Sequence, residues 1–382
     1  MEIGLLGHGV VGGGVDQIIS AAKTPDTQKL HVRRILVKDQ SEVTDDRMTV
    51  RFDEILNDSS IDTVVECMGG IHPAYEFVLQ ALRAHKNVVT SNKKMLANCY
   101  AELMQTAAEN HVILRYEAAV GGGIPWIEQL NRTRRIDEIS EIYGIFNGTT
   151  NYILSNMTEK GIRFEEALKL AQKKGYAEKD PSDDIDGMDV KYKVLLSCAA
   201  AYSLLPNADS ITTYGIRNIS VQDIEYAASH SSTIKLIGRG KRTHHTLSCS
   251  VMPALISNAD PLSHISQNLN ACVLEAETLG TALFMGQGAG ALPTAHAVVQ
   301  DLIDIENGIE YEGMHAHACM IDNQLHKAVY YIRSKKEVCF AGIIEERAGE
   351  NAFLSRKVSL DEIGSLILSA DDPELFAAEV ME

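Results

Sequence analysis

One acidic stretch, closed by a lysine, has the residue types and spacing that chemistry at a carbonyl group requires. Residues 177–193 read AEKDPSDDIDGMDVKYK, so six carboxylates precede Lys193. Asp189 and Lys193 are four residues apart and would share one face of a helix. The apolar residues that follow, VLLSCAAAY, predict that this helix is largely buried, with its polar start facing a cleft. A lysine held beside carboxylates there can hydrogen-bond a carbonyl oxygen and donate a proton as a hydride arrives.

Two other interpretations of this stretch involve no catalysis. A calcium loop of the EF-hand type needs oxygen ligands at its first, third and fifth positions, Gly at the sixth and Glu at the twelfth. With Gly187 at the sixth position, Ser182, Asp184 and Asp186 take the ligand positions, but Lys193 takes the twelfth and brings a cation where the metal needs an anion. The simpler alternative is a solvated acidic loop with a surface ion pair, worth ~0.3–0.5 kcal/mol.

The composition is typical of a soluble globular protein. The chain has 382 residues, of which 45% are hydrophobic and 23% charged, and its length suits two or three domains. A net charge of −17 disfavours nucleic acid and anionic membrane surfaces as partners. No apolar run is long enough to span a bilayer, and the start, MEIGLLGHGV, is unlike a signal peptide. We therefore expect a cytoplasmic protein.

The cysteines agree with a reducing compartment. Seven of them are scattered along the chain without a CxxC pair. His315, His317 and Cys319 form an HxHxC run that resembles a set of metal ligands. Because no second ligand pair lies at zinc spacing, we do not favour a zinc site.

A glycine-rich turn near the amino terminus predicts a dinucleotide-binding site. The apolar run 2–6 is followed by GHGVVGGGV, which fits the G-x-G-x-x-G pattern between a strand and a helix. The first glycine permits a tight turn, the second lets backbone approach the pyrophosphate, and the third lets the helix pack on the strand. The helix N-terminus then offers free N–H groups to the phosphates. The residues assigned to the cofactor here are Gly7, Gly9, Val10, Val11 and Gly12.

The end of the second predicted strand, 31–39, should distinguish NAD from NADP. An acid at this place accepts a hydrogen bond from the ribose 2′-hydroxyl of NAD, whereas a cation accommodates the 2′-phosphate of NADP. The sequence supplies both, as Lys38 and then Asp39. We favour NADP, with Lys38 as its contact, and NAD stays open.

Strands continue to alternate with helices up to about residue 125. This alternation predicts a parallel sheet whose ligands lie outside the carboxyl ends of its strands. Several polar residues and glycines fall at those predicted ends: Gly7, Gly69, Ser91, Lys93 and Glu117.

The middle of the chain has a different pattern. Long β-rich runs such as ISEIYGIFNGTTNYIL alternate with helical stretches, which predicts an antiparallel sheet with helices. Either its own helices or a second subunit must cover that sheet, so a dimer is expected. We predict an α/β Rossmann-like nucleotide-binding domain (1–125 plus 286–308), an α+β substrate-binding and dimerisation domain (126–285), and a short C-terminal α+β segment (309–382).

Six stretches together resemble the homoserine dehydrogenase family. They are GLLGHGVVGGGV, SNKK, YEAAVGGGIP, NGTTNYIL, GYAEKDPSDDIDGMDVKYK and GAGALPTA, in the family's order and spread over most of the chain. The resemblance implies reversible reduction of L-aspartate 4-semialdehyde to L-homoserine with NADPH or NADH, in threonine, methionine and isoleucine biosynthesis. It also implies a homodimer or a dimer-based tetramer.

The resemblance further implies roles for individual residues. Lys193 matches the family's general acid/base lysine, and Lys93 matches a second active-site lysine near the substrate and the nicotinamide. Glu178 matches the carboxylate that receives the substrate ammonium. The remaining matches are Asp184 and Asp189 beside the substrate, Thr149 and Thr150 bordering its pocket, Ser91 and Gly290 near the cofactor, and a monovalent-cation turn, usually holding sodium, of Glu117, Val120, Gly122 and Ile124.

The chemistry of the residues agrees with these assignments. An amino-acid aldehyde needs an anion for its ammonium group, a cation for its carboxylate and a proton donor for its carbonyl. Glu178, Lys93 and Lys193 offer one candidate for each, although the division of roles between the two lysines stays open. The hydride itself belongs to the cofactor.

The tail and two alternative functions stay open. Many family members end in a regulatory ACT domain, and residues 309–382 would be at most a shortened ACT-like domain, so threonine control is in doubt. An aspartate-semialdehyde dehydrogenase would need a cysteine nucleophile, for which Cys67 and Cys99 lie near the sheet edge. A non-catalytic dinucleotide sensor is the other alternative, and the presence of both candidate lysines argues against it.

Overall fold

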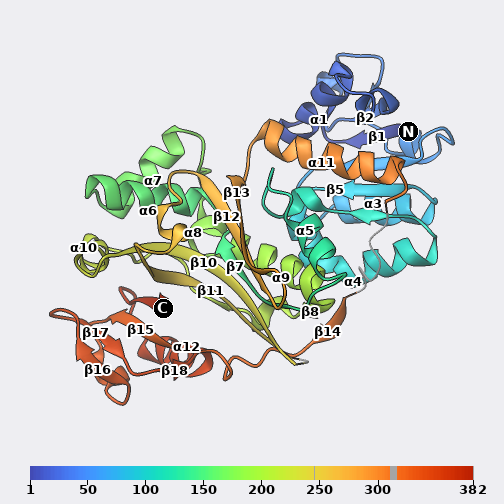
Figure 1. The fold of residues 1–382 in the computed structure, drawn as a ribbon. Helices are drawn as coiled ribbons and strands as arrows, with labels where there is room; N and C mark the ends of the chain where they lie inside the picture. Colours follow the sequence, from blue (N-terminus) through green and yellow to red (C-terminus); the bar gives the residue numbers. More distant parts are fainter. Residues whose placement is uncertain (245, 310–315, 382) are drawn as a thin grey trace. The chain divides into compact units, whose positions relative to one another are not determined.

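The computed structural model describes residues 1–244, 246–309 and 316–381, and the chain forms two compact units (Figure 1). The first unit comprises Met1–Arg135, Ala199–Leu204 and Gly286–His317. The second comprises Ile136–Cys198, Leu205–Met285 and Ala318–Glu382. Within the described part of the chain, no helix combines the length and the apolar character needed to cross a bilayer.

The sheet of the first unit has the strand order of a doubly wound dinucleotide-binding fold. Its six parallel strands run β3-β2-β1-β4-β5-β6, the order 3-2-1-4-5-6. The apolar side chains of Ile3, Val65 and Val89 are fully buried, as expected for parallel strands covered on both faces. The strands are β1 (Glu2–Leu6), β2 (His31–Leu36), β3 (Met48–Thr49), β4 (Thr63–Glu66), β5 (Asn87–Thr90) and β6 (Leu114–Arg115). The predicted Rossmann-like fold is confirmed.

Helices connect these strands and share their core. Val15 of the first helix packs in one apolar cluster with Val298 of α11, so a helix distant in sequence completes this unit. The glycine turn and α11 therefore belong to the same body. The helices are α1 (Val10–Ala21), α2 (Asp53–Leu56), α3 (Ala74–Arg83), α4 (Lys93–Glu109), α5 (Trp126–Thr133) and α11 (Ala291–Glu306).

The second unit contains a large, mostly antiparallel sheet. Its strands run β13-β12-β7-β10-β11-β19-β15-β17-β16, with β18 (Val358–Ser359) beside β15 and β9 (Thr212–Thr213) beside β11. Long strands form the centre: β7 (Ile139–Ile145), β10 (Ser232–Thr243), β11 (Thr246–Ser257), β12 (Leu269–Ala276) and β13 (Gly280–Gln287). The predicted α+β character of this part of the chain is confirmed.

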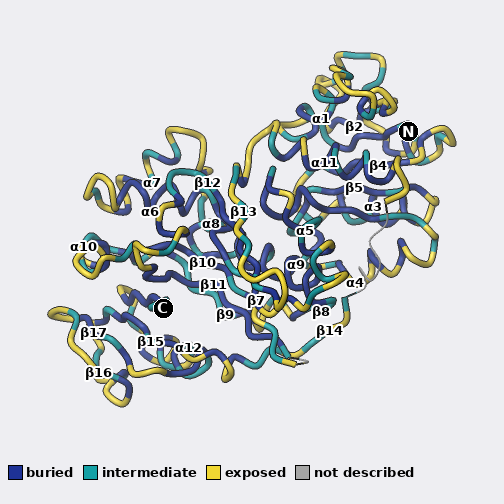
Figure 2. The backbone as a smooth tube through the Cα atoms, viewed as in Figure 1, coloured by how far each residue is buried: buried dark blue, intermediate teal, exposed yellow. Residues whose placement is uncertain are grey.

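The helix that follows the acidic stretch is α9 (Met188–Tyr202), and it is almost wholly buried (Figure 2). Cys198 of α9 lies 3.8 Å, sulfur to sulfur, from Cys249 of β11, so the helix packs directly on the sheet. The burial predicted from VLLSCAAAY is confirmed. The other helices of the unit are α6 (Gly148–Lys160), α7 (Phe164–Lys173), α8 (Ser182–Ile185) and α10 (Val221–Ser229).

The C-terminal strands extend the same sheet. Strands β19 (Phe376–Met381), β15 (Lys327–Arg333), β17 (Ala352–Ser355) and β16 (Ile344–Arg347) lie side by side and antiparallel. This order, with α12 (Leu360–Ala370) before the last strand, is that of a ferredoxin-like βαββαβ unit in which a 3₁₀ turn, Glu337–Phe340, stands at the first helix position. Strand β19 also pairs in parallel with β11, which joins the tail to the central sheet.

Candidate active site

Lys193 lies at the centre of a buried polar cluster in the second unit. Its ammonium nitrogen donates to Asp189 Oδ2 at 2.8 Å and to the Phe146 carbonyl oxygen at 2.6 Å. The side chains of Lys193 and Asp189 are only 9% and 7% exposed. The i,i+4 pairing predicted from the sequence is therefore observed, but as a buried pair and not as a solvated one. A buried ammonium that is hydrogen-bonded on two sides has a fixed direction, which a proton donor needs.

Asn147 joins the carboxylates of this cluster and was not singled out from the sequence. Its amide nitrogen donates to Asp184 Oδ1 at 2.7 Å and to Asp189 Oδ2 at 2.8 Å. Its amide oxygen accepts from the Thr150 backbone N–H at 2.8 Å and so caps helix α6. An asparagine just before a helical stretch is a capping signal that could have identified it.

The surroundings of Asp184 perturb the ionisation of its carboxylate. Burial, and then the neighbouring Asp189 charge, raise the pKa of Asp184 above its ordinary value. Hydrogen bonds from Asn147 and Thr149 act in the opposite direction, as does the charge of Lys193. Two carboxylates, one amide and one ammonium thus share a small buried volume, an arrangement common in sites that bind charged substrates.

Glu178 and Thr150 have different surroundings. Glu178 is exposed, and its carbonyl oxygen accepts a hydrogen bond from Gln172 Nε2 at 3.1 Å. Thr150 is buried, and its hydroxyl donates to the Asn147 carbonyl oxygen at 3.2 Å. The structure therefore brings Thr150 next to the Lys193 cluster through Asn147, while the substrate role of Glu178 stays a prediction.

The acidic stretch does not form the calcium loop that was considered. Residues Ser182–Ile185 are helical, and Asp186 pairs with Arg217 at 2.7 Å. In the part of the chain that the structure describes, no group of three or more His, Cys, Asp or Glu side chains is arranged to hold a metal ion. His317 and Cys319 lie on the short strand β14, and His315 lies outside the described residues.

The glycine turn of the first unit has the geometry that a dinucleotide needs. Gly7 has φ +92°, and a Cβ on Gly12 would collide with the Gly7 carbonyl oxygen. Helix α1 begins at Val10 with Gly9 as its cap, so no side chain satisfies its first N–H groups through a capping bond. Val10 is 72% exposed at this N-terminus. The turn therefore presents backbone donors to an anion.

The second candidate lysine begins a helix at the carboxyl edge of the same sheet. Lys93 is the first residue of α4, and its backbone N–H donates to the Ser91 carbonyl oxygen at 3.2 Å. Asn92 caps α4 by accepting from the Met95 N–H at 3.1 Å and donates to the Gly70 carbonyl oxygen at 2.6 Å. Capping thus fixes the position of the SNKK turn.

Glu66, which was also not predicted from the sequence, is hydrogen-bonded to residues in and next to the SNKK turn. It accepts from the Thr90 hydroxyl at 2.5 Å and from the Met68 N–H at 2.7 Å. Burial raises the pKa of Glu66, and these hydrogen bonds partly offset the effect. Because it stands at the end of β4 beside Asn92, it links the ends of two neighbouring strands at the edge where ligands bind.

The other two candidate cofactor positions are accessible. Lys38 is exposed just after β2, and Gly290 is exposed as the cap of α11, with φ +128°. Both belong to the first unit, as does the glycine turn.

The predicted cation turn is buried and tightly constrained. Glu117 accepts the N–H groups of Ile127 at 2.9 Å and Glu128 at 2.7 Å, so its carboxylate caps helix α5. Burial, and then the Asp301 charge, raise the pKa of Glu117 well above its ordinary value. Gly122 has φ +59° and approaches the Gly288 backbone so closely that a Cβ would not fit. Val120 and Ile124 complete this buried turn.

Neither cysteine near the sheet edge suits a thioester nucleophile. Burial and the Glu66 charge raise the pKa of the Cys67 thiol to about 12, and burial raises the pKa of Cys99. At Cys67 such a pKa keeps the thiol almost entirely protonated at neutral pH, whereas the thiolate is the reactive form.

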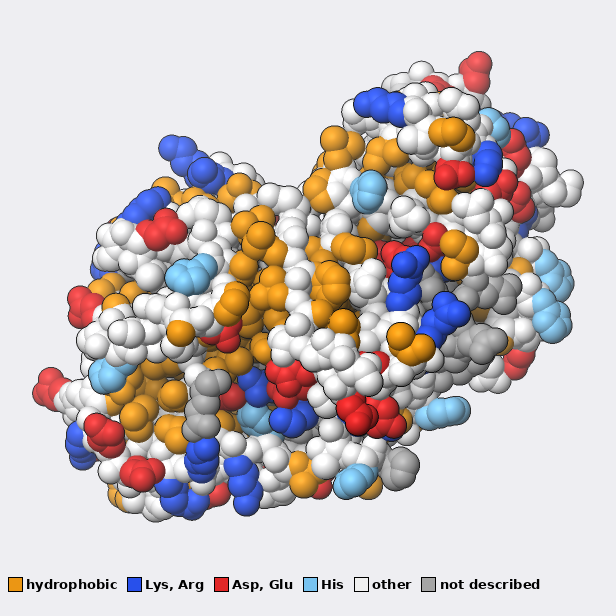
Figure 3. All heavy atoms as spheres, viewed as in Figure 1, with side chains coloured by type: hydrophobic (Ala, Val, Ile, Leu, Met, Phe, Trp, Pro, Cys, Tyr) orange, Lys and Arg blue, Asp and Glu red, His pale blue; other side chains and the backbone are white. Residues whose placement is uncertain are grey.

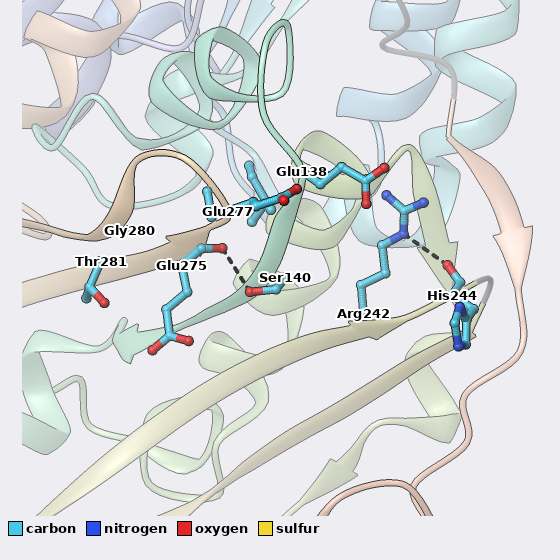
Figure 4. A pocket seen from close by; sticks show the side chains of 10 residues that line it. Glu138, Ser140, Arg242, His244, Glu275, Glu277, Gly280 and Thr281 are labelled. Atoms are coloured by element: carbon cyan, nitrogen blue, oxygen red, sulfur yellow. Dashed lines mark hydrogen bonds between the residues drawn. The ribbon is translucent and has the colours of Figure 1, made fainter.

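One cavity of the second unit lies away from the Lys193 cluster. It has a volume of ≈ 630 Å³ and opens between strands β7, β10, β12 and β13 (Figure 4). Ser140 and Arg242 on its wall donate to the carbonyl oxygens of Glu275 and His244, at 3.2 and 3.0 Å. Ser140 is near the start of β7 and Asn147 follows its end, which puts roughly 20 Å between them. The other lining residues are Glu138, Ile139, Ala276, Glu277, Gly280 and Thr281.

Comparisons with known proteins identify the family of this chain. The family described as "Homoserine dehydrogenase" matches residues 125–303, and "Homoserine dehydrogenase, NAD binding domain" matches residues 7–117. The homoserine dehydrogenase of Synechocystis sp. is 38% identical over 316 residues, which is 80% of this chain and 73% of that one. That of Bacillus subtilis is 34% identical over 314 residues, covering 80% and 72%.

Two solved structures resemble this fold. A homoserine dehydrogenase from Thiobacillus denitrificans matches with a TM-score of 0.88 and 29% identity, covering 100% of this chain and 98% of that one. A hyperthermophilic archaeal homoserine dehydrogenase in complex with NADPH matches with a TM-score of 0.71 and 26% identity, covering 81% and 98%.

Proposed function

The chain belongs to the homoserine dehydrogenase family, and we propose that Lys193 is the proton donor and acceptor of its reaction. The enzyme reversibly reduces L-aspartate 4-semialdehyde to L-homoserine with a nicotinamide dinucleotide. The observation that carries the proposal is the buried ammonium of Lys193, held by Asp189 and by the Phe146 carbonyl oxygen. During reduction, Lys193 donates a proton to the aldehyde oxygen, and during oxidation it accepts the proton of the homoserine hydroxyl.

Three groups of this chain would orient the substrate. Glu178 and Asp184 offer carboxylates to the ammonium group of the amino acid, and Lys93 offers a cation to its carboxylate. Asp189 holds the direction of Lys193 through the 2.8 Å hydrogen bond. Asn147 and Thr150, which are hydrogen-bonded to each other at the start of α6, would form one wall of the substrate pocket.

The first unit fits a dinucleotide. The nicotinamide cofactor, when bound, supplies or accepts the hydride. The pyrophosphate would lie on the backbone of Gly7, Gly9, Val10, Val11 and Gly12, with Ser91, Lys93 and Gly290 near the nicotinamide end. Lys38, exposed beyond β2, suits the 2′-phosphate of NADP, and this supports NADP over NAD as the preferred cofactor.

The turn of Glu117, Val120, Gly122 and Ile124 is our candidate for a monovalent cation such as sodium. Its positive-φ glycine turns backbone carbonyls in directions that helices and strands do not offer. Oxygen ligands of this kind suit a hard cation. The Glu117 carboxylate already caps α5, so the cation would rest on backbone oxygens.

The oligomer and the tail complete the proposal. Hydrophobic side chains gather over the strands of the second unit (Figure 3). Leu279, just before strand β13, and Met285, within it, are more than half exposed. These surfaces support a homodimer, or a tetramer built from dimers, formed through this unit.

The ferredoxin-like strand order of the tail supports a shortened ACT-like domain, in which one helix is reduced to a turn.

Steady-state kinetics of Lys193→Ala test the proposed function. We expect kcat for homoserine oxidation with NADP⁺ to fall by ~10²–10⁴-fold, the usual contribution of a general acid or base. NADPH binding, followed by fluorescence, should be unchanged because Lys193 belongs to the second unit.

The matched control is Lys179→Ala, an exposed lysine of the same acidic stretch, which should keep wild-type turnover. Full activity of Lys193→Ala would refute the proposed role. Dinucleotide binding by the wild type without any turnover would favour the sensor, and phosphate-dependent oxidation of the aldehyde would favour the thioester enzyme.

A further inference from the structure

Asn147 occupies a position that the reaction alone does not explain. Each of its two amide N–H groups has a carboxylate partner, Asp184 Oδ1 at 2.7 Å and Asp189 Oδ2 at 2.8 Å. Asn147 is 4% exposed, its bond to Asp189 is buried, and its bond to Asp184 is partly buried. A single neutral side chain therefore bridges two carboxylates that would otherwise repel each other.

The backbone around Asn147 is fixed from both directions. Its amide oxygen accepts the Thr150 N–H, and the preceding residue, Phe146, accepts the ammonium of Lys193 through its carbonyl oxygen. Strand β7 ends at Ile145 and helix α6 starts at Gly148, so Phe146 and Asn147 form the junction between two rigid elements. Phe146 contacts Lys193 directly, whereas Asn147 contacts Asp189, which in turn contacts Lys193.

We propose that Asn147 is a positioning residue, which fixes the separation of Asp184 and Asp189 and thereby the direction of the Lys193 ammonium. The inference rests on the proposed function of Lys193. In this arrangement Asp189 orients Lys193, and Asp184 binds a cationic group of the substrate. Only a side chain with two N–H donors and one acceptor can make all three bonds, and at this length Asn supplies them.

A change at Asn147 should alter the pH profile as well as the rate. The charged groups that act on Asp184 are Asp189 and Lys193 of α9, and its hydrogen-bond partners are Asn147 and Thr149. Because the Asn147 bond lowers the pKa of Asp184, its loss raises that pKa further. If ionised Asp184 binds the substrate, the acid limb of kcat/KM then moves to higher pH.

The test compares Asn147→Ser with Asn207→Ser in the full-length enzyme. Serine still caps a helix, so α6 should keep its start and the melting temperature should change little. We expect kcat/KM for homoserine to fall by about 10²-fold, as for a small misplacement of reacting groups, with the acid limb moved upward. Asn207 caps a surface 3₁₀ turn, so its variant should match the wild type.

A double-mutant cycle with Asp184→Asn separates positioning from general destabilisation. If Asn147 acts through Asp184, the two changes together should cost less than the sum of their separate effects on log(kcat/KM). Additive effects, or an unmoved pH profile in folded Asn147→Ser, would overturn the inference. If that variant does not fold, Asn147→Asp, which keeps the capping oxygen but lacks both donors, takes its place under the same criteria. Full activity of Lys193→Ala would instead refute the proposed role of Lys193. Failure of that role can therefore be distinguished from failure of the inference about Asn147.

Discussion

Single residues of the Lys193 cluster divide into those that sequence patterns reveal and those that only packing reveals. The spacing of Asp189 and Lys193 and the apolar residues after them were sufficient to predict that both side chains share one face of a buried helix, but not that the pair itself is buried. Asn147 and the Phe146 carbonyl oxygen were not predicted, because they lie more than forty residues earlier and meet α9 only in the folded chain. Glu66 was missed for a similar reason, since its partner Thr90 lies on the next strand.

Asp301 offers a test of the buried charges around the cation turn. Burial raises its pKa to about 7, against opposition from Arg115, and it accepts the Glu117 N–H at 2.9 Å. A carboxyl whose folded pKa lies above its unfolded one gives stability that is present at low pH and lost as the pH rises through the folded value. We therefore expect the wild type to lose stability relative to Asp301→Asn between about pH 4 and pH 7.

Thermal unfolding of both proteins across this pH range measures the effect. The difference in melting temperature should grow up to about pH 7 and then level off. A difference that does not change with pH would mean that Asp301 is ionised in the folded protein throughout, contrary to its buried surroundings.

At the scale of elements, the glycine turn is the clearest case of sequence determining local structure. Alternating strands and helices, together with G-x-G-x-x-G, predicted a Rossmann-like sheet, and the observed strand order agrees. Such patterns are local, so they can be recognised without knowledge of the fold. The pairing of β19 with β11 could not be predicted, because it joins strands more than a hundred residues apart.

Two neighbouring glycines of α1 give a matched pair of variants. A Cβ at Gly12 would collide with the Gly7 carbonyl oxygen, whereas at Gly13 the nearest atom would be 3.8 Å away. Gly12→Ala should therefore displace the turn and weaken NADPH binding by tenfold or more, an order-of-magnitude expectation for misplaced phosphate contacts. Gly13→Ala should bind normally and gain ~0.5–1 kcal/mol of stability, because alanine is the better helix residue.

Titration of both variants with NADPH, together with their melting temperatures, checks this expectation. Equal affinity of the two variants would show that the close contact at Gly12 is not what shapes the cofactor turn.

At the scale of the whole molecule, a buried chain of charges links the tail to the central sheet. Arg239 of β10 pairs with Glu141 of β7 at 3.1 Å and with Glu379 of β19 at 3.4 Å, and Glu379 also accepts from His326 at 3.0 Å. Burial alone would raise the pKa of Glu379, but the Arg239 charge and the His326 bond outweigh it and lower that pKa. The tail is therefore part of the folded second unit, and its loss should destabilise that unit.

Glu379→Ala tests this link without truncating the chain. Removing one partner from a buried ion pair costs about 3–5 kcal/mol, since the other charge stays buried. Glu374→Ala is the control, because its pair with Lys335 is exposed and worth ~0–1 kcal/mol. A carboxylate whose pKa is lowered in the folded state stabilises the protein at pH values above its unfolded pKa. The difference in the free energy of unfolding between wild type and Glu379→Ala should therefore become smaller below about pH 4. If Glu379→Ala and Glu374→Ala are equally stable in urea unfolding, the result would contradict the proposed link between the tail and the central sheet.

The most direct measurement is a crystal structure of the enzyme with NADP⁺ and homoserine bound. The account predicts that the Lys193 ammonium nitrogen lies ~2.6–3.2 Å from the homoserine hydroxyl oxygen, within hydrogen-bond reach, while Asp189 still holds it. A complex in which another side chain contacts that hydroxyl, with Lys193 turned away from the substrate, would contradict the assignment of Lys193 as the proton donor.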